Sequence, residues 1–313
     1  MPHFLSVFAT LLTNRKYIFS VTVIFMAQKV IMTEVKMGKT VFLMVCLILL
    51  FMYVGDAIAG QEGMITAFWM ACGMNVISYF FSDTLVLKQY RAKEVNNQNE
   101  PELYQIVARL AAAAQLPMPK VYIIPEQVPN AFATGRNPKH AAVAATQGLL
   151  ELMSPQELEG VLAHEMSHVR HYDILIGSVA AIFAGAIAML GRSVRNPSTS
   201  DSSAGTSRIG VLGIILVPLA ATVIQMAISR TREYKADEGS AYLTGHPEWL
   251  ISALSKLDGY AKNYQIQRAS RQTAHLFIVN PFSGVSGLSN LFSTHPSTAD
   301  RIAQLEKIGR SLS

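Results

Sequence analysis

The sequence contains little cysteine and little charge. Only two of its 313 residues are cysteine, Cys46 and Cys72, and both lie within apolar stretches. A disulfide framework needs more cysteines in a water-facing setting, so we expect two buried thiols instead. Charged residues make up 15% of the chain, against roughly 25% in a typical soluble domain. The net charge is +5, and no basic stripe with interleaved aromatic residues indicates nucleic-acid binding.

The apolar residues are gathered into long segments. A helix needs about 20 mostly apolar residues to cross the hydrocarbon core of a bilayer. Four segments meet or approach this length: residues 40–54 (extendable to 59), 64–81, 174–190 and 209–228. We expect all four to be transmembrane helices. Segment 174–190 is rich in glycine and alanine, and a buried helix that lines a site is the alternative for it.

Lysine and arginine are distributed unevenly between these segments. The loop 55–63 has neither, whereas residues 82–173 contain many and the stretch 229–313 is also basic. Basic residues flank transmembrane helices on the cytoplasmic side. The pattern therefore predicts one cytoplasmic domain in two parts, 82–173 and 229–313, separated by a transmembrane hairpin over 174–228 with a polar loop at 191–208.

The first 36 residues fit this pattern poorly. Their apolar run, 17–27, is short and ends at Gln28 and Lys29. A signal-peptide core is one interpretation, but no A-x-A-like cleavage site follows. A fifth, short span is another. We favour a third, in which residues 1–36 are an extension outside the native protein and Met37 starts a region, 37–81, with two transmembrane helices.

The hydrophilic parts predict mainly α structure with a small β-sheet. Helical spacing of apolar residues or start signals mark helices, short apolar runs mark strands, and Pro, Gly and Asn mark turns. The expected elements are a helix over 100–116, a strand over 121–124, a loop over 129–140, a strand-like run over 141–150, and helices over 154–173 and 229–245.

The helix expected over 154–173 contains the motif HEMSH, residues 164–168. His164 and His168 lie four positions apart, so both rings are on one face and can meet at one ion. Zinc accepts imidazole nitrogen and prefers four ligands. Glu165 is turned about 100° away, which suits a base that takes a proton from water.

This motif provides two ligands, and a catalytic zinc usually takes three from the protein. His171 is on nearly the same face but about 10 Å along the helix from His164, so we interpret it as interfacial. The downstream candidates are His246, His275, His295 and a carboxylate of the helix over 229–245. We favour Glu233 as the ligand, with Asp237 accepting a hydrogen bond from a ligand histidine. The alternative is an exposed charged helix face.

Together these motifs resemble the HtpX family of integral-membrane zinc metalloproteases, relatives of the CAAX prenyl endopeptidases. The matching stretches are HEMSH (164–168), SRTREYKAD (229–237), PNAFATGRNP (129–138), SDTLVLKQYRAKEV (82–95) and THPSTADRI (294–302), and the match covers roughly 37–309. The resemblance implies a multi-span protein of the bacterial inner membrane with a zincin-like (gluzincin) cytoplasmic catalytic domain. One zinc ion per chain would be held by His164, His168 and Glu233, with Glu165 as the base.

Two further stretches suggest roles at the site. Asn130, Ala131 and Phe132 are candidates for a rim along which an extended substrate lies, and a tight structural turn is the alternative. His295 is a candidate for hydrogen bonding to the oxyanion or to Glu233.

Arg301 is a candidate partner of Asp237. The stretch around His295 and Arg301 is alternatively only a helix start, capped by Thr294 or Ser297.

The expected activity is hydrolysis of peptide bonds in membrane or misfolded proteins at the cytoplasmic face. One alternative is a prenyl-protein endopeptidase, against which four spans and a small domain argue. Another is a zinc-stabilised membrane scaffold without protease activity, against which Glu165 and an open metal position argue. The expected partners are protein substrates and the lipid bilayer, and the sequence does not indicate an oligomeric state.

Overall fold

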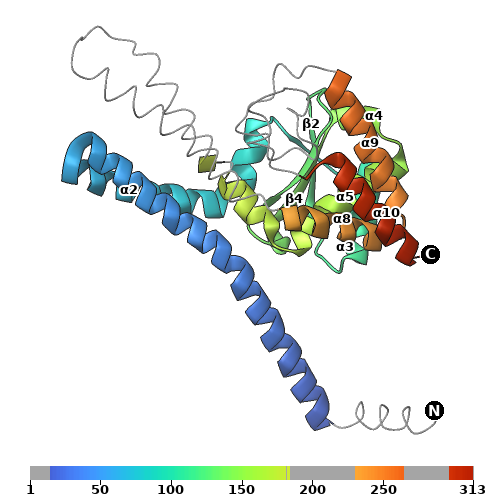
Figure 1. Ribbon diagram of the computed structural model, residues 1–313, viewed down its shortest axis with the longest axis horizontal. Coiled ribbons are helices and arrows are strands. Elements are labelled where there is room, and N and C mark those ends of the chain that lie inside the picture. Colours follow the sequence, from blue (N-terminus) through green and yellow to red (C-terminus); the bar gives the residue numbers. More distant parts are fainter. Residues whose placement is uncertain (1–14, 181, 184–229, 264–295, 313) are drawn as a thin grey trace. The chain divides into compact units, whose positions relative to one another are not determined.

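The computed structural model describes residues 15–180, 182–183, 230–263 and 296–312 (Figure 1). The chain divides into two compact units, residues 1–42 and 43–313. In the first unit, residues 15–42 belong to helix α2. The second unit contains the rest of α2, the sheet and the other helices that the structure describes. The polar loop 191–208 and the apolar segment 209–228 lie outside the described residues.

Helix α2, Arg15–Gln89, is interrupted by a turn at Ala59 and Gly60. Gly60 has φ +61° and ψ −148°, a conformation open to glycine because it has no Cβ. The two arms approach each other so closely that a Cβ at Gly55 would collide with the carbonyl oxygen of Gly63. Asn75 also donates a hydrogen bond of 3.3 Å to the carbonyl of Met44. The two apolar segments expected over 40–54 and 64–81 therefore form a helical hairpin.

The second arm, Ala59–Gln89, is long and apolar enough to cross a membrane, while Thr40–Asp56 is a shorter apolar helix. Large apolar side chains point out of the hairpin, including Val45, Leu49, Tyr53, Trp69, Val76 and Phe80. Exposed apolar side chains on this scale need an apolar surrounding. The described part of the third segment, residues 174–180 and 182–183, is also helical.

The sheet has four strands: β1 (Lys93–Val95), β2 (Lys120–Ile124), β3 (Ala131–Gly135) and β4 (Ala141–Thr146). Their order is β1-β2-β4-β3, with β2 and β4 parallel and the outer pairs antiparallel. Within the described residues, β3 is therefore an edge strand, paired with β4 alone.

Two expectations for this region are wrong. The stretch 129–140 is not one loop, because its centre pairs with β4 as strand β3 and its end is the 3-10 helix η1, Pro138–His140. The turn-forming residues flank the strand rather than exclude it. The apolar run 141–150 is not one strand either, because the Thr146 side chain caps helix α4, Gln147–Leu152.

Where the structure describes the chain, five more helices form or cover the core: α3 (Pro101–Ala113), α5 (Pro155–Arg170), α8 (Arg230–Thr244), α9 (Pro247–Asn263) and α10 (Thr298–Leu312). Helix α5 is central, because it contacts α3, α8, α9 and β3 (Figure 1). Its residues Val161, Leu162 and Met166 are fully buried in the main apolar cluster. The sequence predicts that this helix extends to residue 173, but α5 ends at Arg170. Residues 171–172 form a turn, and a new helical stretch begins at Asp173.

The start of α5 is fixed by the capping box that the sequence indicates. The Ser154 hydroxyl accepts a hydrogen bond from the Glu157 N–H, and the Glu157 carboxylate accepts one of 2.8 Å from the Ser154 N–H. The same carboxylate also accepts hydrogen bonds from the side chains of Ser252 and Lys256 of α9, each of 2.6 Å. The beginning of α5 is thus tied to α9, which fixes the helix that carries the HEMSH motif.

Candidate metal centre

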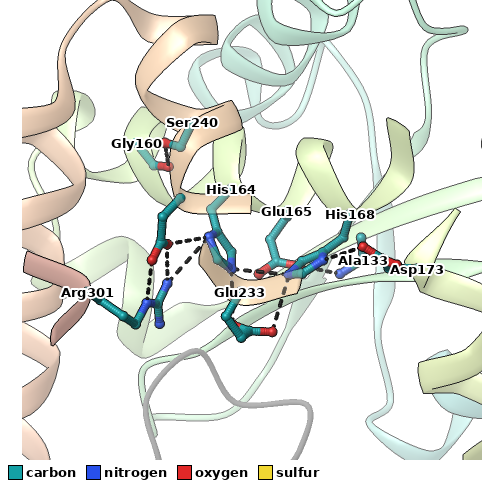
Figure 2. Close-up of polar contacts among 10 residues, drawn as sticks. Ala133, Gly160, His164, Glu165, His168, Asp173, Glu233, Ser240 and Arg301 are labelled. Carbon is teal, nitrogen blue, oxygen red and sulfur yellow. Dashed lines mark hydrogen bonds and ion pairs between the residues drawn. The ribbon is translucent and has the colours of Figure 1, made fainter. Parts of the chain in front are cut away.

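Helices α5 and α8 pack closely because small residues face each other. A Cβ at Gly239 of α8 would overlap the side chain of Ser167 on α5. About two turns closer to the start of α5, the Ser240 hydroxyl donates a hydrogen bond of 2.7 Å to the carbonyl of Gly160 (Figure 2). This close approach places Glu233 of α8 beside the histidines of α5.

His164, His168 and Glu233 point toward one another (Figure 2). The two Nε2 atoms are 3.2 Å apart, His164 Nε2 is 3.6 Å from Glu233 Oε2, and His168 Nε2 is 3.7 Å from Glu233 Oε1. One donor atom from each residue fits within a span of 4.8 Å. Ligand atoms about 2.1 Å from a tetrahedral ion lie about 3.4 Å from one another. The three side chains therefore fit a single small cation.

The first histidine is oriented by a buried carboxylate. His164 Nδ1 lies 2.9 Å from Asp237 Oδ1, and Arg301 of α10 binds both oxygens of Asp237. Burial disfavours the charged form of all three groups, but their mutual contacts outweigh it. Thus Arg301 and His164 hold the pKa of Asp237 below its usual range. With no ion bound, Asp237 and then Glu233 raise the pKa of His164 to about 9.

The second histidine has a carboxylate partner that the sequence analysis did not predict. His168 Nδ1 lies 3.4 Å from Asp173 Oδ2, and Asp173 Oδ1 lies 3.8 Å from the guanidinium of Arg232. With both Nδ1 atoms turned to carboxylates, both Nε2 atoms are left for an ion. Nothing in the residues around Asp173 or around Arg232 in the sequence predicts that these two side chains meet.

Glu165 lies beside the three donors but is not one of them. Its side chain is buried, and its Oε2 accepts a hydrogen bond of 2.9 Å from the backbone N–H of Ala133 on strand β3 (Figure 2). Burial is the largest influence on this carboxyl, ahead of the nearby histidines, and it raises the pKa of Glu165. A carboxyl with a raised pKa suits a group that accepts and returns a proton.

The rim candidates lie at and just before the start of strand β3. The side chains of Asn130, Ala131 and Phe132 are all buried, and Phe132 belongs to the apolar cluster that also contains Val86 near the end of α2. The group that reaches the site from this strand is instead the N–H of Ala133. Strand alternation could have found it only if residues 131–135 had been recognised as a strand.

The structure describes most of the remaining candidates. Arg301 makes the expected pair with Asp237, and Ser297 caps α10 by accepting from the Asp300 N–H at 3.1 Å. His171 ends α5 and is not part of the donor group, while His246 is exposed and pairs with Glu248. His275 and His295 lie outside the described residues.

Two histidines of an H-E-x-x-H helix, a glutamate from a later helix and a buried glutamate beside them define a metalloprotease. Comparison with known protein families agrees with this, because residues 97–309 match the sequence model of peptidase family M48. The chain therefore belongs to peptidase family M48, and within it to the HtpX proteases, as its sequence motifs indicate.

Two relatives illustrate the match. A "Protease HtpX homolog" of Campylobacter curvus is 62% identical over 279 residues, which are 88% of this chain and 98% of the relative. One of Campylobacter concisus is 60% identical over 280 residues, 88% of this chain and 97% of the relative. The crystal structure of S. mikatae Ste24p is 19% identical with a TM-score of 0.46, and the match covers 91% of this chain and 66% of that one.

Proposed function

We propose that this protein is a zinc endopeptidase that cleaves membrane or misfolded proteins at the cytoplasmic face of a bacterial inner membrane. The observation that carries the proposal is that one donor atom from each of His164, His168 and Glu233 lies within 4.8 Å of the others, beside the buried Glu165. Two imidazoles and one carboxylate are the protein ligands of a type of hydrolytic zinc site that leaves one position open. The proposed ligands are therefore His164, His168 and Glu233, one ion per chain.

Zinc, when bound, supplies a Lewis acid that polarises a carbonyl and makes water easier to deprotonate. The chain's own contribution to the chemistry is Glu165. Its carboxylate accepts the proton of the attacking water and afterwards returns it to the leaving amine. Asp237 and Asp173 hold the two imidazoles in the tautomer that presents Nε2.

Strand β3 offers a place for the substrate. Its outer edge has no partner strand among the described residues, and the Ala133 N–H points from it to Glu165. An extended peptide can add to such an edge through main-chain hydrogen bonds. In this arrangement the rim residues 130–132 contribute their backbone rather than their buried side chains, and the scissile bond lies beside Glu165.

The membrane arrangement rests on the distribution of apolar and basic residues. The α2 hairpin exposes large apolar side chains, and its C-terminal end leads directly into β1 and the basic stretch 82–173. In the proposed topology the catalytic domain faces the cytoplasm, and segments 174–190 and 209–228 form a second hairpin. Substrates would be cleaved close to the membrane surface.

Metal analysis and proteolysis of purified protein in detergent test the proposal. We expect about one zinc per chain, and hydrolysis of unfolded casein that stops with a chelator and returns with zinc. Glu165→Gln should keep its zinc and lose at least about a thousandfold in rate. Glu233→Ala should lose its zinc, whereas Glu238→Ala, exposed on the same helix, should keep it. Full cleavage by Glu165→Gln, or full zinc occupancy of Glu233→Ala, would refute these roles.

A further inference from the structure

Asp173 connects a candidate metal ligand to an arginine of another helix. Its Oδ2 lies 3.4 Å from His168 Nδ1, and its Oδ1 lies 3.8 Å from Arg232 Nη1. The side chains of Asp173, Arg232 and His168 are only 16–19% exposed. A carboxylate that bridges an imidazole and a guanidinium in such partial burial is held more firmly than a surface pair.

The same arrangement occurs on the other histidine. His164 Nδ1 faces Asp237, which is bound by Arg301. Each ligand histidine is thus backed by an aspartate, and each aspartate by an arginine. The two arrangements differ in their burial. Asp237 and Arg301 lie in the interior between α8 and α10, and their side chains are at most 1% exposed.

Asp173 and Arg232 instead stand at the two ends of the stretch expected to cross the membrane. Asp173 begins the helical residues that follow α5, immediately before the apolar segment that starts at residue 174. Arg232 lies in the first turn of α8, shortly after the apolar segment that ends at residue 228. It also directly precedes Glu233, so the pair touches one candidate ligand and adjoins another.

We propose that Asp173 and Arg232 form a clip that joins the helical stretch beginning at Asp173 to the first turn of α8 and orients His168 toward the metal. Zinc affinity then depends on these two helix starts being held together. The inference rests on the proposed function in that it takes His168 as a zinc ligand. Asp173 and Arg232 are positioning residues, since neither reaches the donor atoms.

The test compares zinc binding of variants in the Glu165→Gln background, in which self-cleavage cannot interfere. A fluorescent zinc chelator that competes for the ion measures the dissociation constant. Loss of an outer hydrogen-bond partner typically weakens metal binding by about 10–100-fold. We expect this for Asp173→Asn, a smaller loss for Arg232→Gln, and recovery of most of the affinity in Arg232→Lys. The double variant Asp173→Asn/Arg232→Gln should bind zinc no more weakly than Asp173→Asn, because each single change already breaks the same Asp173–Arg232 contact.

The matched control is Glu159→Gln, an acid-to-amide change on α5 at a similar exposure that breaks the pair with the exposed Arg109, away from the donor group, and should leave zinc affinity unchanged. Hydrogen–deuterium exchange of the metal-free proteins adds a second readout. Asp173→Asn should speed exchange in peptides covering both 171–176 and 230–235. The clip is overturned if Asp173→Asn binds zinc within twofold of its parent, if the two changes are additive, or if only 171–176 exchanges faster.

The two proposals fail differently. If the parent protein binds no zinc, the proposed function fails, and the exchange experiment still decides on the clip. If Asp173→Asn does not fold, the comparison of Arg232→Gln with Arg232→Lys decides instead, and equal zinc affinity of these two variants and their parent overturns the clip.

Discussion

Arg301 binds Asp237 through two hydrogen bonds, 2.6 Å from Nη2 to Oδ1 and 2.8 Å from Nε to Oδ2. Both side chains are at most 1% exposed, and 64 positions separate them in the sequence. The same Asp237 Oδ1 lies 2.9 Å from His164 Nδ1. A residue of the last helix therefore orients, through Asp237, a histidine of the HEMSH motif.

We expect Arg301→Ala to destabilise the protein by about 3–5 kcal/mol, because it leaves the buried carboxylate of Asp237 without a counter-charge. Arg301→Lys should fall between this variant and the wild type, since one ammonium does not reproduce the paired bonds of a guanidinium. Thermal unfolding together with zinc content measures both effects. Arg310→Ala, an exposed position at the end of α10, is the control, and equal melting of all three variants would contradict the prediction.

Gly239→Ala should separate α5 from α8. Its methyl group would overlap the Ser167 side chain, so the helices must move apart and carry Glu233 away from the histidines. We expect loss of most bound zinc, with partial recovery in the double variant Gly239→Ala/Ser167→Gly. At Gly259 of α9 an added Cβ meets no atom within 4 Å, so Gly259→Ala should retain zinc. Elemental analysis of the purified proteins decides, and a fully loaded Gly239→Ala would show that the close packing is not needed.

Glu157 should make stability depend on pH in the acid range. Burial works to raise its pKa, but hydrogen bonds from Lys256, Ser252 and the Ser154 N–H outweigh it and lower the pKa to about 2, from 4.5. Between these values the unfolded chain binds a proton that the folded protein does not. The stabilisation is therefore complete above about pH 4.5 and is lost as the pH falls toward 2.

Glu157→Gln should remove this dependence and lower the free energy of unfolding at neutral pH by at most about 3 kcal/mol. Denaturant unfolding between pH 3 and pH 7 measures this change, with Glu159→Gln on the same helix as the control. A wild-type curve that stays flat below pH 4.5 would count against the assignment.

Trp69 should face lipid acyl chains. Its side chain is 69% exposed on the apolar arm Ala59–Gln89, and the only other tryptophan is Trp249. In the variant Trp249→Phe, brominated lipids in a nanodisc should therefore quench the remaining fluorescence strongly. Iodide in the surrounding water should quench it weakly. The opposite order of the two quenchers would place this helix outside the bilayer.

Parts of the fold follow from local patterns. Three elements can be recognised from a few neighbouring residues: helix α5 from its capping residues, helix α3 from its apolar spacing, and strand β2 from its apolar run. Strand β3 does not, because its short sequence AFATG sits among turn-forming residues and becomes a strand only by pairing with β4. The helix α4 was missed for a related reason, since Thr146 both ends the strand and caps the helix.

The site shows the same division. By itself, the sequence determined the pair His164 and His168, because four positions on a helix bring two side chains to one face. It also indicated Glu233 and Asp237 by the same spacing. The stretch THPSTADRI (294–302) also suggested Arg301 as the partner of Asp237. Only the tertiary structure brought Ala133 and the pair Asp173–Arg232 to the site. Their contacts arise where separate elements pack against one another, and no local spacing in a sequence encodes such a meeting.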